Sequence, residues 1–230
     1  MKNEDAHYWV IIPGAGMGSR FAHHQPKQYV KVVEKTILEH SIDCFLSQPW
    51  VKKIIMVLAE NDTVFSQLPI AQHPKIVRVP GGLQRHISVN NALTYLKNQA
   101  APDDWVLVHD AVRPCLHAED LLRLVQTVSH SPVGGILAMP AQDTLKLVVE
   151  SHIQHTIPRA QIWHAQTPQM FRLAPLIAAM QHCEQSGFTV TDEASAIEQS
   201  GHQPIVVEAH FPNPKLTTFK DLAYIEGLLS

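Results

Sequence analysis

The 230-residue sequence has few cysteines and no long apolar run. Its three cysteines, Cys44, Cys115 and Cys183, lie far apart and form no CxxC pair, so neither a disulfide framework nor a zinc site is indicated. No segment approaches the roughly 18 apolar residues of a membrane span, and the first residues lack the apolar stretch of a signal peptide. We therefore expect a cytoplasmic protein with no part in a membrane.

The sequence also lacks an excess of positive charge, with 18 Lys and Arg residues against 21 Asp and Glu residues. A broad nucleic-acid surface is therefore not expected, although a small anionic ligand would need only a local group of cations. The 15 histidines include no HExxH motif or comparable ligand set, and we interpret the close pairs His23–His24 and His152–His155 as surface loop residues.

Short β-branched segments alternate with helical patterns along the chain. Strands are expected at residues 8–12, 51–59, 105–110, 134–140 and 204–209, and helices at 36–47, 88–98, 118–130, 174–187, 192–201 and 219–229. This alternation predicts an α/β fold, in which a Rossmann-like, mostly parallel sheet is flanked by helices. No linker is visible, so residues 1–230 are expected to form one domain.

Residues 141–168 break the alternation. Apolar and polar residues alternate there on both sides of "ESHIQ", as in a two-stranded hairpin with a turn. Because an isolated hairpin is marginally stable in water, we expect this arm to pack against another surface, plausibly a second subunit.

The stretch "VIIPGAGMGSRFAHHQPKQY" at residues 10–29 joins a strand to a glycine-rich turn and two cations. Gly14, Gly16 and Gly18 would let backbone N–H groups approach anionic oxygens. The P-loop and the dinucleotide fingerprint are both excluded, because each needs a glycine at position 19, which is serine. A tight structural turn would explain the glycines alone, but Arg20 and Lys27 favour a polyphosphate.

Two further segments are candidate parts of the site. Asp110 ends the strand in "VLVHDAVRP", where open α/β sheets bind ligands, and could hold Mg²⁺ together with phosphate oxygens. A helix cap is the alternative for this residue. In "GGLQRHIS", Gly82, Arg85 and Ser88 could contact a base or ribose, unless Ser88 serves only as a helix N-cap.

Other cations and hydroxyls are ambiguous by themselves. Each would more often be a surface residue, and Thr191 in "TDEAS" could simply cap a helix. These residues are Arg113, Thr144, Arg159, Thr167, Thr191 and Lys215.

Together these motifs resemble the 2-C-methyl-D-erythritol 4-phosphate cytidylyltransferase family of the non-mevalonate isoprenoid pathway. The resemblance is carried by the glycine turn with Arg20 and "PKQY", and by "TILEHSI", "GGLQRHISV", "VLVHDAVRP", "DTLK", "WHAQTPQ", "TDEASA" and "PKLTT" in one order. Two positions depart from the family pattern. Gly14 and Val112 each stand where members usually have alanine.

The resemblance implies transfer of CMP from CTP to methylerythritol phosphate, with Mg²⁺ on Asp110, in a nucleotidyltransferase-type fold. It implies that Arg20 and Lys27 act on the triphosphate beside the backbone of Gly14, Ala15, Gly16 and Gly18, and that Gly82, Arg85 and Ser88 serve the cytidine. It further implies that Arg159 and Lys215 position the acceptor, that the arm crosses to a partner in a homodimer, and that the remaining acceptor contacts come from Arg113, Thr144 and Thr167. Thr191 is a further candidate substrate-binding residue.

Two other functions remain open at this point. The chain could be a cytidylyltransferase for another polyol phosphate, such as ribitol 5-phosphate, or a nucleotide-binding regulatory domain without turnover. The complete "TDEAS" and "WHAQTPQ" motifs favour the methylerythritol enzyme over the first, and the joint presence of Arg20, Lys27, Asp110, Arg159 and Lys215 argues against the second.

Overall fold

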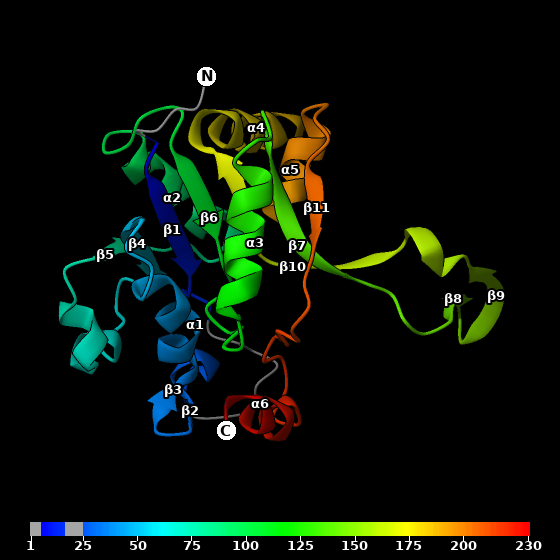
Figure 1. Ribbon diagram of the computed structural model, residues 1–230, viewed down its shortest axis with the longest axis horizontal. Coiled ribbons are helices and arrows are strands. Elements are labelled where there is room, and N and C mark those ends of the chain that lie inside the picture. The colour runs from blue at the N-terminus through cyan, green and yellow to red at the C-terminus, as the bar shows by residue number, and fades with distance from the viewer. Residues whose placement is uncertain (1–5, 17–24) are drawn as a thin grey trace.

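The computed structural model describes residues 6–16 and 25–230. A seven-stranded sheet forms its centre, and helices cover both faces (Figure 1). The strands of this sheet are β1 (Tyr8–Pro13), β4 (Val51–Leu58), β5 (Ile76–Pro80), β6 (Trp105–Val108), β7 (Gly134–Pro140), β10 (Trp163–Arg172) and β11 (Ile205–Glu208). The helices are α1 (Ile37–Leu46), α2 (Arg85–Leu96), α3 (Ala118–Val128), α4 (Leu173–Ser186), α5 (Glu193–Gln199) and α6 (Asp221–Leu229).

The sheet has the strand order β11-β7-β10-β6-β1-β4-β5. All of these strands are parallel except β10, which runs antiparallel to both of its neighbours, β6 and β7. The Rossmann-like, mostly parallel fold expected from the sequence is therefore confirmed. Short 3-10 turns occupy the connections at η1 (Lys27–Tyr29), η2 (Phe65–Gln67), η3 (Pro69–Gln72) and η4 (Arg159–Gln161).

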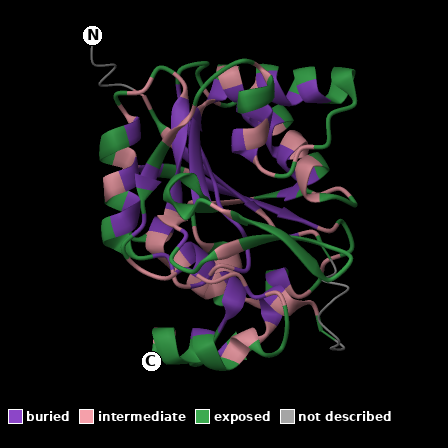
Figure 2. Cartoon of the chain, turned by 90° about the vertical axis from the view of Figure 1, so that its right-hand side faces the viewer, coloured by how far each residue is buried: buried purple, intermediate pink, exposed green. Residues whose placement is uncertain are grey.

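Strand β1 shows why its sequence is continuously apolar. Trp9 and Ile11 point into the core beneath α2, α4 and α5, whereas Val10 and Ile12 point into the core beneath α1 and α3. Successive side chains of a strand face opposite sides of the sheet, so a strand with both faces covered needs apolar residues throughout. Figure 2 shows the strands as a buried layer between helices with exposed outer faces.

Helix ends follow local sequence signals. Thr36 caps α1 by accepting a hydrogen bond from the Glu39 N–H, and the Glu39 carboxylate accepts one from the Thr36 N–H in return. Gly187 ends α4 in the left-handed conformation, with φ of 69°, as its position after the apolar pattern predicted.

Two parts of the fold differ from the expectation. Strand β5 was not expected from the sequence, and residues 163–168, assigned there to the arm, form the first part of β10 in the central sheet. The arm proper is the separate hairpin of β8 (Leu145–Val149) and β9 (His152–Ile157), which reverses at Glu150 and Ser151 and extends away from the sheet (Figure 1). A second small hairpin joins β2 (Lys31–Val32) to β3 (Lys35–Thr36).

Candidate active site

The centre of the site is Asp110, which directly follows β6. Its Oδ1 accepts a hydrogen bond from Arg85 Nε at 3.1 Å, and its Oδ2 lies 2.9 Å from Lys215 Nζ and 3.4 Å from Arg113 Nε. Arg85 begins α2, Arg113 lies in the loop after β6, and Lys215 precedes α6. The fold therefore brings three cations, from segments up to 130 positions apart in the sequence (Arg85 to Lys215), onto one carboxylate.

These cations determine the ionisation of Asp110. Burial by itself would raise the pKa of this carboxyl group, but Arg85, Lys215 and Arg113 outweigh burial and hold the pKa well below its usual range. Asp110 is therefore an anion at neutral pH and can serve as a ligand for a cation.

His109 and Thr167 form the floor beneath Asp110. The His109 ring is fully buried, with Nε2 3.0 Å from the Arg113 carbonyl oxygen and Nδ1 3.0 Å from Thr167 Oγ1. A carbonyl oxygen can only accept, so Nε2 carries the proton and Nδ1 accepts from the Thr167 hydroxyl. Thr167 Oγ1 in turn accepts a hydrogen bond from the Asp110 N–H, which fixes the backbone of Asp110. His109 thus packs beneath the site and is not exposed to a ligand.

Sequence reasoning missed Glu193, the first residue of α5. Its carboxylate is completely buried and accepts from Arg85 Nη1 at 2.6 Å and from Arg85 Nη2 at 2.9 Å. Burial would lower the pKa of the Arg85 guanidinium, but Glu193 and Asp110 outweigh it and raise the pKa. The "TDEAS" motif contained this acid, but nothing in the sequence indicated that its carboxylate would be buried against Arg85.

The glycine turn is fixed to the sheet at its first residue. The Gly14 N–H donates to the Val57 carbonyl at 2.8 Å, and the Gly14 carbonyl accepts from Gln28 Nε2 at 2.9 Å. The Gly14 N–H therefore donates to a backbone carbonyl, whereas the sequence predicted that it would bind a phosphate. Gln28, the last residue of "PKQ", is a second residue that sequence reasoning missed. Gly18 and Arg20 lie outside the described residues.

Lys27 reaches the same region from η1. Its Nζ donates to the Leu216 carbonyl at 2.9 Å, next in the chain to Lys215. Residues of the "PKQY" and "PKLTT" segments, nearly 190 positions apart, are therefore neighbours in space.

The segment before α2 also differs in detail from the expectation. The interpretation of Ser88 as an N-cap is wrong, because α2 begins at Arg85 and its N-cap is Gln84. Ser88 Oγ instead accepts a hydrogen bond from the Gly82 N–H at 3.1 Å and so fixes the backbone of the segment before α2. The interpretation of Thr191 as a cap is likewise wrong, because Asp192 is the N-cap of α5.

Two expected acceptor residues lie on the arm, away from the Asp110 cluster. Thr144 is exposed just before β8, and Arg159 donates to the Gln142 carbonyl across the base of the arm. Among the ion pairs of residues 6–16 and 25–230, none joins Arg159 to Asp110. A single chain therefore does not bring Arg159 and Lys215 together in this structure.

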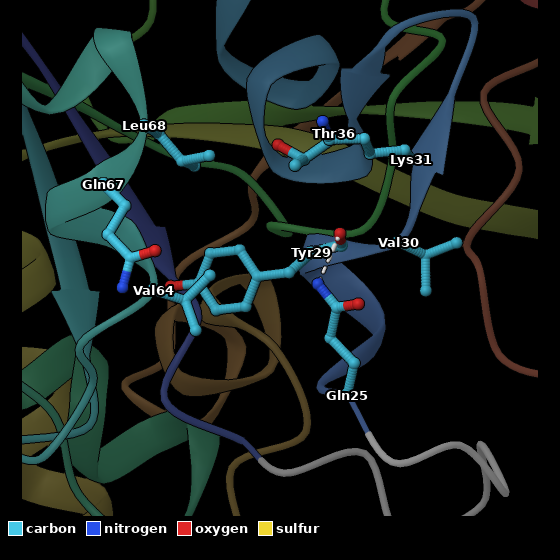
Figure 3. A pocket seen from close by; sticks show the side chains of 8 residues that line it. All are labelled: Gln25, Tyr29, Val30, Lys31, Thr36, Val64, Gln67 and Leu68. Atoms are coloured by element: carbon cyan, nitrogen blue, oxygen red, sulfur yellow. Dashed lines mark hydrogen bonds between the residues drawn. The ribbon is translucent and has the colours of Figure 1, made fainter.

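A cavity of about 510 Å³ is lined by Tyr29 of η1 and Gln67 of η2 among others (Figure 3), and Asp110 is not part of its lining. Its wall includes Tyr29, whose hydroxyl donates to Asp62 Oδ2 at 2.6 Å, and Gln25, whose Nε2 donates to the Tyr29 carbonyl. The lining is mainly apolar and carries one cation, Lys31, so the cavity lacks the charge needed to hold a triphosphate.

The part of the chain that the structure describes contains no group of three or more His, Cys, Asp or Glu side chains able to hold a metal ion. It likewise contains no helix long and apolar enough to cross a membrane. A metal on Asp110 would therefore need ligands from the substrate and from water.

A Rossmann-like sheet with a glycine turn after its first strand and a carboxylate at the end of a neighbouring strand is typical of nucleotide-binding enzymes, among them the nucleotidyltransferases. Residues 8–230 match the family model of 2-C-methyl-D-erythritol 4-phosphate cytidylyltransferase. The chain belongs to this family, and it is a CTP-dependent cytidylyltransferase of the methylerythritol phosphate pathway.

Individual relatives agree over nearly the whole length. The chain is 48% identical to the enzyme of that name from Pseudomonas putida strain F1, over 95% of this chain and 94% of the relative, and 44% identical to that from Vibrio atlanticus, over 96% and 94%. A crystal structure of a 4-diphosphocytidyl-2C-methyl-D-erythritol synthase superposes with a TM-score of 0.85 at 35% identity, covering 98% of this chain and 99% of that one. The Francisella tularensis enzyme gives 0.83 at 39% identity, covering 97% and 100%.

Proposed function

We propose that this protein transfers CMP from CTP to 2-C-methyl-D-erythritol 4-phosphate and releases pyrophosphate at the Asp110 cluster. The observation that carries the proposal is the convergence of Arg85, Arg113 and Lys215 on one buried carboxylate. Lys27 lies nearby, because its Nζ donates to the carbonyl of Leu216, the residue after Lys215. Such a site suits two polyanions that must be brought together.

The chemistry needs no protein nucleophile. An oxygen of the acceptor phosphate attacks the α-phosphorus of CTP, and the bond from this phosphorus to the bridging oxygen breaks as pyrophosphate leaves. A phosphate monoester is already mostly a dianion at neutral pH, so no general base has to remove a proton. The protein must align the two anions and neutralise the charge that develops at the α-phosphate.

The nucleotide half of the site combines the glycine turn with the segment before α2. The backbone of Ala15 and Gly16, together with Gly18, Arg20 and Lys27, holds the triphosphate, while Gly14 shapes the turn. Gly82, Arg85 and Ser88 hold the cytidine. The Gln28 and Lys27 hydrogen bonds support this assignment, because they attach the "PKQ" segment both to the glycine turn and to residue 216.

Asp110 suits Mg²⁺ as a single protein ligand. Mg²⁺ commonly binds one or two carboxylates and completes its coordination with phosphate oxygens and water. The carboxylate is held ionised by its neighbours and lies at a strand end beside the phosphate turn. When bound, the ion would neutralise charge on the CTP phosphates.

The acceptor half is completed by a second subunit. Lys215, Arg113 and Thr191 surround the acceptor phosphate from one subunit, and Arg159 and Thr144 come from the partner's arm. Thr167, expected to contact the acceptor, instead supports Asp110 from below, because its hydroxyl donates its proton to His109. The arm supports this proposal because it projects from the sheet with exposed apolar side chains, among them Val148, Val149 and Ile153, which are 51%, 52% and 64% exposed. We further propose that the protein, whose described cysteines are free thiols, works in the cytoplasm.

Pyrophosphate release tests the activity. CTP with methylerythritol phosphate should give rapid release, and CTP with ribitol 5-phosphate should give little. Removing one charge-stabilising donor typically lowers turnover by about 10²–10³-fold, so we expect this effect from Lys27→Ala with the fold retained. Release that is equally fast with ribitol 5-phosphate, or unchanged turnover in Lys27→Ala, would contradict the assignment.

Mixed dimers test the shared site. Arg159→Ala and Lys215→Ala homodimers should each be inactive. A heterodimer of the two variants would contain one site with both residues intact, and should show about half of the wild-type activity per dimer. If subunit exchange is verified and activity does not return, the two residues serve one subunit and the composite site is refuted.

A further inference from the structure

Glu193 is a buried carboxylate whose only side-chain partner in the described structure is Arg85. Removing an anion from water is costly unless it is paired, and here both carboxylate oxygens receive a guanidinium N–H. The two residues lie 108 positions apart, so local helix geometry does not require the pair. The pair instead joins the start of α5 to the start of α2, at the edge of the Asp110 cluster.

The backbone on both sides of Glu193 is held by Gln169 of β10. Gln169 Nε2 donates to Asp192 Oδ2 at 2.8 Å, and Gln169 Oε1 accepts from the Ala194 N–H at 2.9 Å. Gln169 is itself buried, at 1% exposure. Because the residues before and after Glu193 are fixed to the sheet, its carboxylate is held in place for Arg85.

Glu193 determines which edge of the Arg85 guanidinium faces Asp110. The Nη edge is taken by Glu193, so Arg85 offers Asp110 only its Nε, at 3.1 Å. Without Glu193, the guanidinium could turn its two-nitrogen edge onto Asp110, and two-bond pairing of this kind is the stronger geometry. Asp110 would then be held more tightly by Arg85, and a metal ion would have to compete with that pair.

We propose that Glu193 is a positioning residue, which holds the Nη edge of Arg85 away from Asp110 and so keeps the Asp110 carboxylate accessible to the divalent cation that accompanies CTP. This inference rests on the metal role proposed above for Asp110. Glu193 touches no substrate in this assignment and acts only through Arg85.

The test is the Glu193→Gln variant, which keeps the side-chain size and removes the charge. Binding of the Mn²⁺–CTP complex, without acceptor, is measured by water-proton relaxation enhancement, and the Mg²⁺ concentration for half-maximal turnover is measured separately. Loss of a supporting partner of a metal ligand typically weakens metal affinity by about tenfold or more. We therefore expect the affinity for Mn²⁺–CTP to fall, and the Mg²⁺ concentration for half-maximal turnover to rise, each by about tenfold. Turnover at saturating Mg²⁺ should recover to near the wild-type value. Glu198→Gln, at an exposed position of the same helix, is the matched control and should change neither.

A double variant separates positioning from mere structural support. In Arg85→Gln/Glu193→Gln, both charges of the pair are removed, so folding no longer leaves an unpaired buried charge and position 85 has no guanidinium that could turn onto Asp110. Mn²⁺ affinity should return toward the wild-type value, even if CTP affinity falls. If the double variant binds Mn²⁺ as weakly as Glu193→Gln, or if a folded Glu193→Gln binds it normally, the inference is wrong.

Asp110→Asn distinguishes this failure from failure of the proposed function. If Asp110→Asn abolishes Mn²⁺ binding while Glu193→Gln leaves it unchanged, only the positioning role fails. If Asp110→Asn binds Mn²⁺ like the wild type, the metal role of Asp110 fails as well.

Discussion

His109 should make folding stability depend on pH between neutral and mildly acidic conditions. The imidazole is fully buried, contacts the Phe45 ring edge to face at 5.2 Å between centroids, and is held by Thr167 and the Arg113 carbonyl. Burial lowers the pKa of His109 to about 4, against the opposing hydrogen bond to Arg113 and the charge of Asp110. The folded protein therefore keeps this ring neutral at pH values where the unfolded chain protonates it.

The sign and size follow from linkage. The pKa of a histidine in the unfolded chain is about 6.5, so between about pH 6.5 and pH 4 the unfolded state binds a proton that the folded state does not. The free energy of unfolding must then fall as the pH falls through this range. The two pKa values give a loss of about 1.4 kcal/mol at pH 5.5 and about 3 kcal/mol at pH 4.

His109→Gln isolates this contribution, because glutamine can still donate to the Arg113 carbonyl but does not titrate. Urea unfolding of the wild type and the variant is measured at pH 7 and at pH 5.5. The variant should be less stable at pH 7, but it should lose about 1.2 kcal/mol less than the wild type between pH 7 and pH 5.5, because about 0.2 kcal/mol of the histidine contribution is already lost at pH 7. His182→Gln, at an exposed position on α4, is the control for removing an imidazole elsewhere. If the His109→Gln variant and the wild type lose equal stability, the buried neutral imidazole is refuted.

Three substitutions test other parts of the site. Asp110→Asn, which removes the anion at nearly constant shape, should lower turnover by about 10²-fold or more in pyrophosphate release, and turnover that persists in excess EDTA would contradict the metal's role. Gly14→Ala should retain turnover, because the added Cβ would lie 3.1 Å from Leu58 Cδ2, the flexible end of that side chain. The reduced freedom of the unfolded chain favours alanine by about 0.4–1 kcal/mol. A loss of unfolding free energy well beyond about 1 kcal/mol in urea would show that Leu58 cannot adjust. Gly81→Ala should raise the KM for CTP, because the added Cβ would lie 2.4 Å from Ala15 Cβ and would displace the glycine turn that follows β1. An unchanged KM would show that this contact lies outside the nucleotide site.

The sequence by itself determined the fold class and most of the central elements. A strand buried on both faces must be apolar throughout, as β1 is, and a helix that ends in a left-handed turn favours glycine, as at Gly187. The apolar strand pattern and the glycine at a helix end each depend only on residues close in the sequence, so both can be recognised without the tertiary structure. Family-like motifs similarly indicated Asp110, Lys27 and Lys215 as parts of one site.

Only the tertiary structure decided how these residues meet. Strand β10 was hard to foresee because residues 163–165 are exposed although they pair with β7, and the strand becomes buried only from Gln166 onward. Capping was left open as the alternative role of Ser88 and Thr191 because a hydroxyl before a helical pattern suggests a cap, whereas the true helix boundaries depend on packing. The pairing of Glu193 with Arg85 had no local signal, because an acid in the first turn of a helix is also favoured by the helix dipole alone. Its burial, and so its partner, follows only from the docking of α5 on β10.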